Sequence, residues 1–333
     1  MTEYKVNCLK NSEYETWDEF VDNSPQGTLF HKSYWLEASG RKFLVYGCFK
    51  GGQLVAGIPV VCKSKFGVRY ASHPQLTPYL GIVFKPDHDL KYVSRISDQK
   101  QISREISKRL KEDFSSIKIS FAPFPVDLQP FIWEGFTANV SYTYLLSIDD
   151  LELVWKNMDK KRRNDIRRAE EDGIYVETSS NFNEIFSLVE KTLRRQKGKV
   201  DRQIASKYNE TLSERNQCKS LLAKNKRGDI IAGAYTVWDN KRAYYLLGGF
   251  DPEKSQRGAS AIAVWEAIKF TKKELGLNEF DFEGSMIPEV EQFFREFGGK
   301  LTPRYSVIWR KPHMKLLSFM YESARSTFNR IRS

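Results

Sequence analysis

The segment GQLVAG at residues 52–57 recurs in the second half of the chain as GDIIAG at residues 228–233. Each copy begins with a glycine typical of a turn, continues as an apolar strand, and ends in Ala-Gly, where a second backbone can approach closely. A second pair follows in the same order, FIWEGF at residues 131–136 and FFREFG at residues 293–298. Two repeated pairs in one order indicate that a single α+β unit is duplicated along the chain.

Length supports the same division, because 333 residues exceed what one hydrophobic core usually supports. We predict a first domain at residues 1–150, a second at 151–310, and a basic amphipathic helix at 311–333. Helix and strand signals alternate through both halves, as in an α+β domain whose mixed twisted sheet is flanked by helices. The predicted helices are 14–23, 32–39, 98–113, 151–172, 183–195 and 259–275. The predicted strands are 43–49, 54–62, 81–84, 116–121, 142–148, 220–223, 230–238, 243–248, 279–282 and 305–309.

Composition excludes several classes of protein. Hydrophobic residues make up 41% of the chain, so it is not a disordered or low-complexity sequence. The four cysteines are scattered, without Cys-x-x-Cys or histidine at ligand spacing, so we expect neither a disulfide framework nor a metal site. No apolar run reaches the roughly 18 residues of a membrane-spanning helix, and the first residues lack the apolar stretch of a signal peptide. We therefore expect a cytoplasmic protein.

Basic charge is concentrated in the second half. Residues 1–150 hold 18 basic and 17 acidic side chains, whereas residues 151–333 hold 35 and 25. The asymmetry indicates a polyanionic partner, which is a nucleic acid, an anionic membrane surface or a phosphate-rich co-substrate. The helix at 311–333 would supply peripheral contact with an anionic membrane; the alternative is a terminal helix that packs on the first domain.

A phosphate site is predicted where a glycine-ended strand leads through a basic loop into a helix that opens on small residues. The start of a helix exposes unpaired N–H groups with partial positive charge, small residues let a phosphate reach them, and Arg257 adds a full charge. The alternative is an ordinary strand–turn–helix connection. The residues that we expect to bind a donor in this segment are Leu247, Gly248, Gly249, Gln256, Arg257, Gly258, Ala259 and Ser260.

A candidate general base lies in EFDFEGS at residues 279–285. On a strand the three carboxylates share one face, and Glu283 comes last, beside a glycine, where a strand typically opens into a cleft. A carboxylate there can take a proton from an attacking amine. The alternative is a solvated acidic face paired with nearby lysines.

Two further segments are candidates for binding. Residues 156–168 contain seven basic side chains among thirteen, and a related run covers 191–199; such runs neutralise phosphates or serve only as a soluble helix surface. The loop PQLTPYLG at residues 74–81 has two prolines, and Tyr79 offers a ring face and a hydroxyl to an acceptor pocket, unless the loop is purely structural. Motifs for serine hydrolysis, NTP hydrolysis, hydride transfer and zinc proteolysis are absent from the sequence.

Four stretches of the chain resemble the FemAB-like branch of the GNAT acyltransferase superfamily. They are Trp155–Ile174, Trp265–Lys269, Phe280–Ser285 and Phe293–Gly299. The resemblance implies tandem GNAT-like domains, with residues 1–150 on the acceptor side and 151–310 on the donor side. It also implies transfer of an acyl or aminoacyl group to an amine. The sequence differs from the family pattern in two ways. Ala259 stands where the GNAT phosphate loop has its first glycine. The long helical hairpin of the tRNA-using members is not visible in this sequence.

On this resemblance we expect an acyl-CoA or an aminoacyl-tRNA as co-substrate and no permanently bound cofactor. The acceptor would be an amine of a cell-envelope precursor, either an amino sugar of polysaccharide biosynthesis or a peptidoglycan peptide. Main-chain N–H groups near Leu247–Gly249 would polarise the donor carbonyl and Glu283 would deprotonate the amine. We expect Tyr79, Arg163 and Tyr305 to contact the acceptor.

Two alternatives from other classes depend on the basic half alone. One is a non-catalytic nucleic-acid-binding protein, whose affinity would fall steeply with salt. The other is a membrane-surface protein that uses the C-terminal helix.

Overall fold

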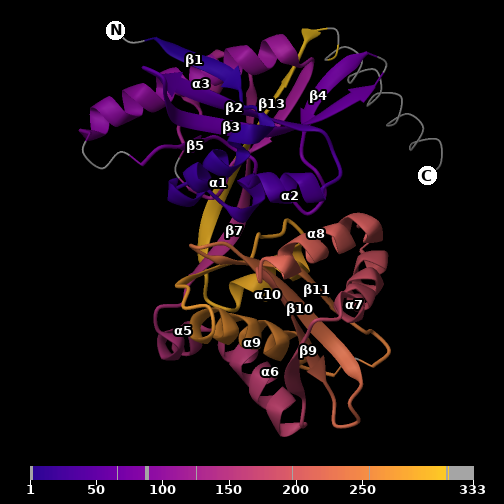
Figure 1. Cartoon of the computed structure of the whole chain (residues 1–333). Helices are drawn as coiled ribbons and strands as arrows, with labels where there is room; N and C mark the ends of the chain where they lie inside the picture. The colour runs from indigo at the N-terminus through magenta and orange to yellow at the C-terminus, as the bar shows by residue number, and fades with distance from the viewer. Residues whose placement is uncertain are drawn as a thin grey trace, which may run out of the picture. The chain divides into compact units, whose positions relative to one another are not determined.

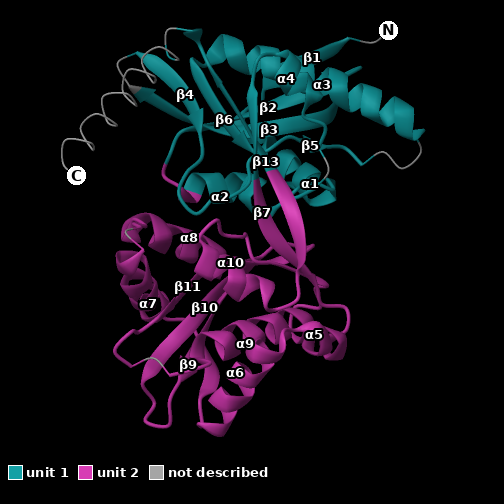
Figure 2. Cartoon of the chain, turned by 180° about the vertical axis from the view of Figure 1, so that it is seen from behind, with its two compact units in different colours: residues 1–37, 41–140, 305–333 teal, residues 38–40, 141–304 magenta. Residues whose placement is uncertain are grey.

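The computed structural model describes residues 3–65, 67–86, 90–124, 126–196, 198–254, 256–312 and 314, which form two compact units (Figures 1 and 2). Unit 2 comprises residues 38–40 and 141–304, and the other described residues form unit 1. The chain leaves unit 1 within one strand and returns within another, so the division falls at residues 140 and 304, where we predicted 150 and 310. The predicted helix at 311–333 lies almost entirely outside the described residues.

Unit 1 is built on a sheet with the strand order β1-β2-β3-β4-β6, completed by the last part of β13. Neighbouring strands are antiparallel except β4 and β6, which are parallel. Its elements are β1 (Tyr4–Cys8), α1 (Tyr14–Asn23), α2 (Ser33–Ala38), β2 (Phe43–Lys50), β3 (Gln53–Lys65), β4 (Val68–Ser72), β5 (Val83–Phe84), α3 (Tyr92–Asp113), β6 (Ser116–Ser120), α4 (Gln129–Trp133) and β7 (Thr137–Ser147), which continues into unit 2.

Unit 2 repeats this arrangement with the order β8-β9-β10-β11-β12, completed by the last part of β7. Only β11 and β12 are parallel neighbours among these strands. Its elements are α5 (Leu151–Asn157), α6 (Lys160–Glu171), β8 (Tyr175–Ser179), α7 (Phe182–Arg195), α8 (Arg202–Glu214), β9 (Cys218–Lys224), β10 (Ile230–Trp238), β11 (Ala243–Phe250), α9 (Ala259–Lys273), β12 (Glu279–Asp281), α10 (Pro288–Arg295) and β13 (Lys300–Arg310), which continues into unit 1.

The glycines of the sequence repeat serve the same purpose in both units. A Cβ added at Gly57 in β3 would lie 2.5 Å from the ring of Trp17 in α1. A Cβ added at Gly233 in β10 would lie 2.6 Å from the Cδ1 atom of Ile185 in α7. In each unit the first helix after the edge strand therefore packs directly on a glycine of the third strand. The predicted repeat of sequence is a repeat of structure.

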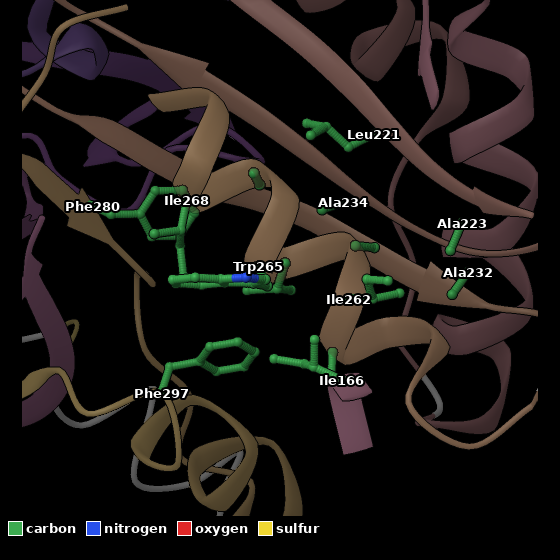
Figure 3. Close-up of a cluster of buried hydrophobic side chains, with 14 of the residues drawn as sticks. Ile166, Leu221, Ala223, Ala232, Ala234, Ile262, Trp265, Ile268, Phe280 and Phe297 are labelled. Carbon is green, nitrogen blue, oxygen red and sulfur yellow. The ribbon is translucent and has the colours of Figure 1, made fainter. Parts of the chain in front are cut away.

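The core of unit 2 lies between its sheet and α9 (Figure 3). Trp265 and Ile268 of α9 pack in one cluster with Ala232 and Ala234 of β10. Gly233 lies between these alanines and points to the opposite face, where it meets α7. The two helices therefore cover opposite faces of the sheet, and the alanines let α9 approach closely.

Most predicted elements are confirmed, and the differences have local causes. The helix at 14–23 and the strand at 230–238 match α1 and β10 in full. The predicted single helix at 151–172 is two helices, because the Asp159 side chain accepts the Lys161 N–H (2.7 Å) and starts α6 anew. The predicted strand at 81–84 is only two residues long as β5. The elements that we did not predict are β1, β4, α4, β8, α8 and α10.

The helices in the described ranges are all too short or too polar to span a lipid bilayer.

Candidate active site

A split opens between the central strands of unit 2. The register between β11 and β12 contains two pairs, and the last joins Tyr244 to Asp281. Beyond this pair β11 continues beside β10 to Phe250. The chain after β12 instead follows β7, where the Phe282 N–H donates to the Tyr144 carbonyl at 3.1 Å. The two strands therefore diverge, and the main-chain groups of Leu247–Gly249 lie on the β11 side of the split.

A β-bulge lies at the start of the β11 side of this split. Tyr235 and Thr236 are consecutive in β10 but pair with Leu247 and Tyr245. Leu246 is therefore an extra residue in β11. A bulge bends its strand and changes the direction of the groups that follow, so the end of β11 is turned relative to β12.

The N–H group of Gly248 points into the split. The Asp251 N–H donates to the Ile231 carbonyl on the β10 side (3.0 Å), whereas the Phe250 N–H donates to the Thr192 hydroxyl of α7 (3.1 Å). Main-chain groups alternate in direction along a strand, so the Gly248 N–H points away from β10, as the Phe250 N–H does. Within the split this N–H group can donate to a ligand.

Gly249 is needed because α7 lies directly against it. An added Cβ would be 2.4 Å from both the carbonyl carbon and the carbonyl oxygen of Leu188. These atoms belong to a backbone and cannot rotate away. The two predicted glycines thus have different roles, since the missing Cβ of Gly248 leaves room for the Tyr245 side chain and that of Gly249 lets α7 pack.

Glu283 lies on the other side of the split, two residues after the last pair. Its φ is +55°, in the left-handed region, and such a conformation costs a residue other than glycine on the order of 1–3 kcal/mol. Its N–H donates to Oδ1 of Asp281 (2.8 Å), and the buried Asp281 also accepts a hydrogen bond from the Thr143 hydroxyl (2.7 Å). The carboxylate of Asp281 therefore holds the chain in the turn that carries Glu283.

The carboxyl group of Glu283 has the properties of a base. Its Oε1 atom is buried, and no hydrogen-bond partner for it exists among the described residues. Removal from water is the main reason why the pKa of Glu283 is well above its ordinary value, and the nearby charge of Asp281 raises it further, while Arg304 opposes the shift. A carboxylate with a raised pKa accepts a proton near neutral pH more readily than an ordinary one.

A hollow of about 570 Å³ lies at the start of α9. It is lined by Arg168, Asp172, Gln256 and Arg257. Two of the predicted donor-binding residues therefore line one cavity, and the Arg257 side chain is 61% exposed while its Nε atom donates to Asp165 (2.7 Å). A basic hollow beside the first turn of a helix is a suitable place for a phosphate.

The remaining residues of the predicted phosphate loop are packed more tightly than the sequence indicates. Gly258 has φ +86°, and an added Cβ would be 2.0 Å from the Asp165 carbonyl oxygen, so only glycine fits there. Ala259 is fully buried in the core, and its N–H donates to the Gln256 carbonyl (3.2 Å). Its methyl group therefore points into the protein, and its N–H has an internal partner. Ser260, in the first turn, is half-buried.

The basic helix α6 is partly structural. Arg162 is buried, forms an ion pair with Glu296 (2.5 Å) and lies over the ring of Phe293 at 4.3 Å. This pair joins two of the stretches quoted for the family resemblance. Arg163 donates to the carbonyls of Trp155 (3.2 Å) and Lys156 (2.6 Å), so it caps the end of α5. The residue that we expected to contact an acceptor is therefore engaged by main-chain groups.

Tyr79 differs from expectation, because its ring is fully buried beside Phe30 at a centroid distance of 5.7 Å. The loop that carries it runs beside β6, where the Leu80 N–H donates to the Ser120 carbonyl (2.8 Å). A Cβ added at Gly81 would be 2.6 Å from the ring of Phe121. The loop thus fills the place in unit 1 that corresponds to the split in unit 2, so the ring offers no face to a ligand.

Tyr305, the third expected acceptor contact, is half-buried in the part of β13 that belongs to unit 1. Its carbonyl accepts the N–H of Phe121 (2.8 Å), and its ring packs against the core of unit 1. Within unit 2, Gly248 and Glu283 lie on the two chain segments that diverge after the Tyr244–Asp281 pair, and Gln256 and Arg257 line one hollow at the start of α9. Sequence reasoning missed Asp281, whose contact with the Glu283 N–H depends on a turn that leaves no local signal.

Comparisons with known proteins agree with this geometry. Residues 156–295 match the family model described as acetyltransferase (GNAT) domain. No match was found among curated proteins. The matched residues contain both sides of the split and the hollow at α9.

Three solved structures are similar over nearly the whole chain. FemX has 16% sequence identity and a TM-score of 0.70, over 94% of this chain and 99% of its own. The C-terminal domain of a putative lysylphosphatidylglycerol synthetase from Agrobacterium fabrum has 14% identity and a TM-score of 0.57, over 93% and 96%. A tandem GNAT protein from the clavulanic acid biosynthesis pathway has 10% identity and a TM-score of 0.53, over 92% and 98%. These likenesses confirm the predicted fold of tandem GNAT-like units, each with a mixed twisted sheet flanked by helices.

Proposed function

We propose that this protein is an acyltransferase, as the match of residues 156–295 to the acetyltransferase (GNAT) domain model supports, and that it acylates an amine of a cell-envelope precursor. The donor is an acyl-CoA or an aminoacyl-tRNA, and the acceptor is an amino sugar or a peptidoglycan peptide. The observation that carries this proposal is the split between β11 and β12, with the Gly248 N–H on one side and Glu283 on the other. The reaction takes place in the cytoplasm, where both donors are made.

In the proposed reaction the donor carbonyl enters the split and accepts a hydrogen bond from the Gly248 N–H. The amine nitrogen attacks the carbonyl carbon, and a C–N bond forms while the carbonyl oxygen gains negative charge. Glu283 takes the proton that the amine loses. The C–S or C–O bond to the leaving group then breaks, and the leaving thiolate or ribose alkoxide receives, through water, the proton that Glu283 took from the amine. A hydrogen-bond donor that is held in place at a developing oxyanion raises kcat by a factor of about 10²–10³.

The phosphates of the donor would lie in the hollow at α9. Arg257 supplies the charge that faces the hollow, and Gln256 supplies an amide beside it. In acyl-CoA the pyrophosphate lies at the far end of the pantetheine arm, and in aminoacyl-tRNA the nearest phosphate is on the terminal nucleotide, so either donor offers a phosphate that the hollow could bind. The methyl of Ala259, which stands where the GNAT phosphate loop has its first glycine, is buried in the core and does not reduce the space for a phosphate.

We assign the acceptor side to unit 1. Its own strand pair is covered by the loop that carries Tyr79, which leaves the second unit as the place for donor chemistry. Tyr305 remains the proposed acceptor contact on this side, since its ring is half-buried rather than enclosed.

Transfer is tested with radiolabelled acetyl-CoA and with alanyl-tRNA, each mixed with UDP-glucosamine or a UDP-linked peptidoglycan pentapeptide. The proposal predicts a labelled, amine-acylated product in at least one mixture, identified by its mass. It would be contradicted by the absence of product in every mixture together with equal, salt-sensitive binding of charged and uncharged tRNA. That result is the one expected of a non-catalytic nucleic-acid-binding protein.

A further inference from the structure

We propose that Tyr245 is a catalytic residue whose hydroxyl donates a hydrogen bond to the carbonyl oxygen of the acyl group during transfer. This inference rests on the proposed function and adds a side-chain donor to the main-chain donor at Gly248. It concerns a residue that neither the sequence motifs nor the family stretches include.

Tyr245 lies at the base of the split. It is the first residue of β11 after Tyr244, whose pairing with Asp281 is the last between the two strands. Its ring contacts Phe282, which follows β12, at a centroid distance of 6.5 Å. It also contacts Phe294 of α10 edge-on at 5.6 Å. The ring is therefore held by the opposite side of the split and has little freedom to turn away.

The hydroxyl of Tyr245 lies over the backbone of Gly248. A Cβ added at Gly248 would be 1.6 Å from the phenolic oxygen and 2.4 Å from the ring carbon that bears it. In a regular strand, residues three apart point to opposite faces. The extra residue Leu246 brings Tyr245 and Gly248 to the same face. The bulge and the glycine together place the hydroxyl beside the N–H group that points into the split.

This hydroxyl has no hydrogen-bond partner in the described part of the chain, and burial alone raises its pKa. Tyr245 is half-buried, so its hydroxyl can be reached by a ligand, whereas two fully buried tyrosines of unit 2 are paired: Tyr244 donates to Asp239 (2.6 Å), and Tyr235 donates to Asn209 (3.0 Å). The raised pKa keeps the phenol protonated at neutral pH, so it can act as a donor but not as a base.

A hydrogen bond from Tyr245 is consistent with the movement of electrons and protons in the reaction. When the amine attacks, the C=O electron pair moves to the oxygen, which accepts hydrogen bonds from Tyr245 and Gly248. When the carbonyl re-forms, the bond to the leaving sulfur or oxygen breaks. The amine proton goes to Glu283, and Tyr245 keeps its own proton throughout. Its contribution is therefore electrostatic and falls on kcat rather than on substrate binding.

The test compares Tyr245→Phe with Tyr244→Phe in the full chain. Both variants lose one hydroxyl from adjacent residues of β11 and keep the ring. We expect Tyr245→Phe to lower kcat by about 10²–10³, with KM nearly unchanged and no loss of melting temperature. We expect Tyr244→Phe to lower the melting temperature, because the buried Asp239 loses a donor, and to leave kcat nearly unchanged.

A spectroscopic readout is independent of turnover. In the complex with acetyl-CoA labelled with ¹³C at the carbonyl, the C=O stretch should lie at lower frequency in the wild type than in Tyr245→Phe, because a hydrogen bond weakens that bond. An active wild type with the same kcat and the same stretch as Tyr245→Phe would overturn this inference and leave the proposed function standing. A wild type that binds no donor and transfers no acyl group would overturn the proposed function, and the inference with it.

Discussion

Replacing Glu283 by glutamine separates the catalytic value of this carboxyl group from its structural cost. The substitution keeps the shape of the side chain and removes its charge and its basicity. A general base contributes about 10²–10⁴ to the rate. At about 1.4 kcal/mol for each factor of ten, the barrier should rise by roughly 3–5 kcal/mol. The donor KM should be nearly unchanged, since the proposed phosphate site is at Arg257 and not at Glu283.

The same substitution should stabilise the fold at neutral pH. The pKa of Glu283 is raised in the folded protein, because Oε1 is buried without a partner and Asp281 lies nearby. As pH rises above the ordinary glutamate pKa, the unfolded chain ionises before the folded one does. The wild type therefore loses stability through that window, up to the raised folded pKa. Glutamine does not titrate, so the variant should gain about 1–3 kcal/mol of unfolding free energy relative to wild type.

The assay is urea denaturation of both proteins between pH 4 and pH 8, together with kcat at pH 8. The positive φ of residue 283 is common to both proteins, so its strain cancels in the comparison. The difference in unfolding free energy should be small at pH 4 and should grow with pH in favour of the glutamine variant. A variant that loses stability relative to wild type as pH rises, or that retains more than a tenth of the wild-type kcat, would refute the reasoning.

Three further predictions concern the neighbours of this site. Arg257→Ala should raise the KM for acetyl-CoA roughly tenfold or more with kcat retained, because a charge-assisted contact is worth about 1.5–3 kcal/mol; an unchanged KM would place the phosphates elsewhere. Gly249→Ala should lower the unfolding free energy in urea by about 1–3 kcal/mol, because the new Cβ meets the backbone of α7 at 2.4 Å; a neutral result would contradict that close approach. Asp281→Asn should shift the acidic limb of the kcat/KM–pH profile to lower pH, because removing its charge lowers the pKa of Glu283; an unmoved limb would show that another group is the base.

The sequence was sufficient to predict the features that depend on local signals. Gly57 and Gly233 identified β3 and β10 as equivalent strands, because in each unit a helix packs directly on this glycine. Gln256 and Arg257 were expected at a phosphate site because a loop that enters a helix exposes its own side chains. Glu283 was singled out because a glycine follows it at the end of a strand.

Features that depend on distant packing were not predictable. The bulge at Leu246 arises from the register against β10, and nothing in the alternation of β11 indicates it. The burial of Tyr79 depends on β6 and Phe30, which lie far from it in sequence. Arg163 was expected to contact the acceptor, although the break between α5 and α6 gives it main-chain partners.

Acyl transfer between β11 and β12 of unit 2 can be tested by nuclear magnetic resonance on the protein labelled with ¹⁵N in its 20 glycines, titrated with acetyl-CoA and separately with alanyl-tRNA. We expect one of these donors to shift the amide signals of Gly248 and Gly258, while that of Gly57 stays in place. A shift confined to glycines of unit 1, with Gly248 unmoved at saturation by either donor, would contradict it.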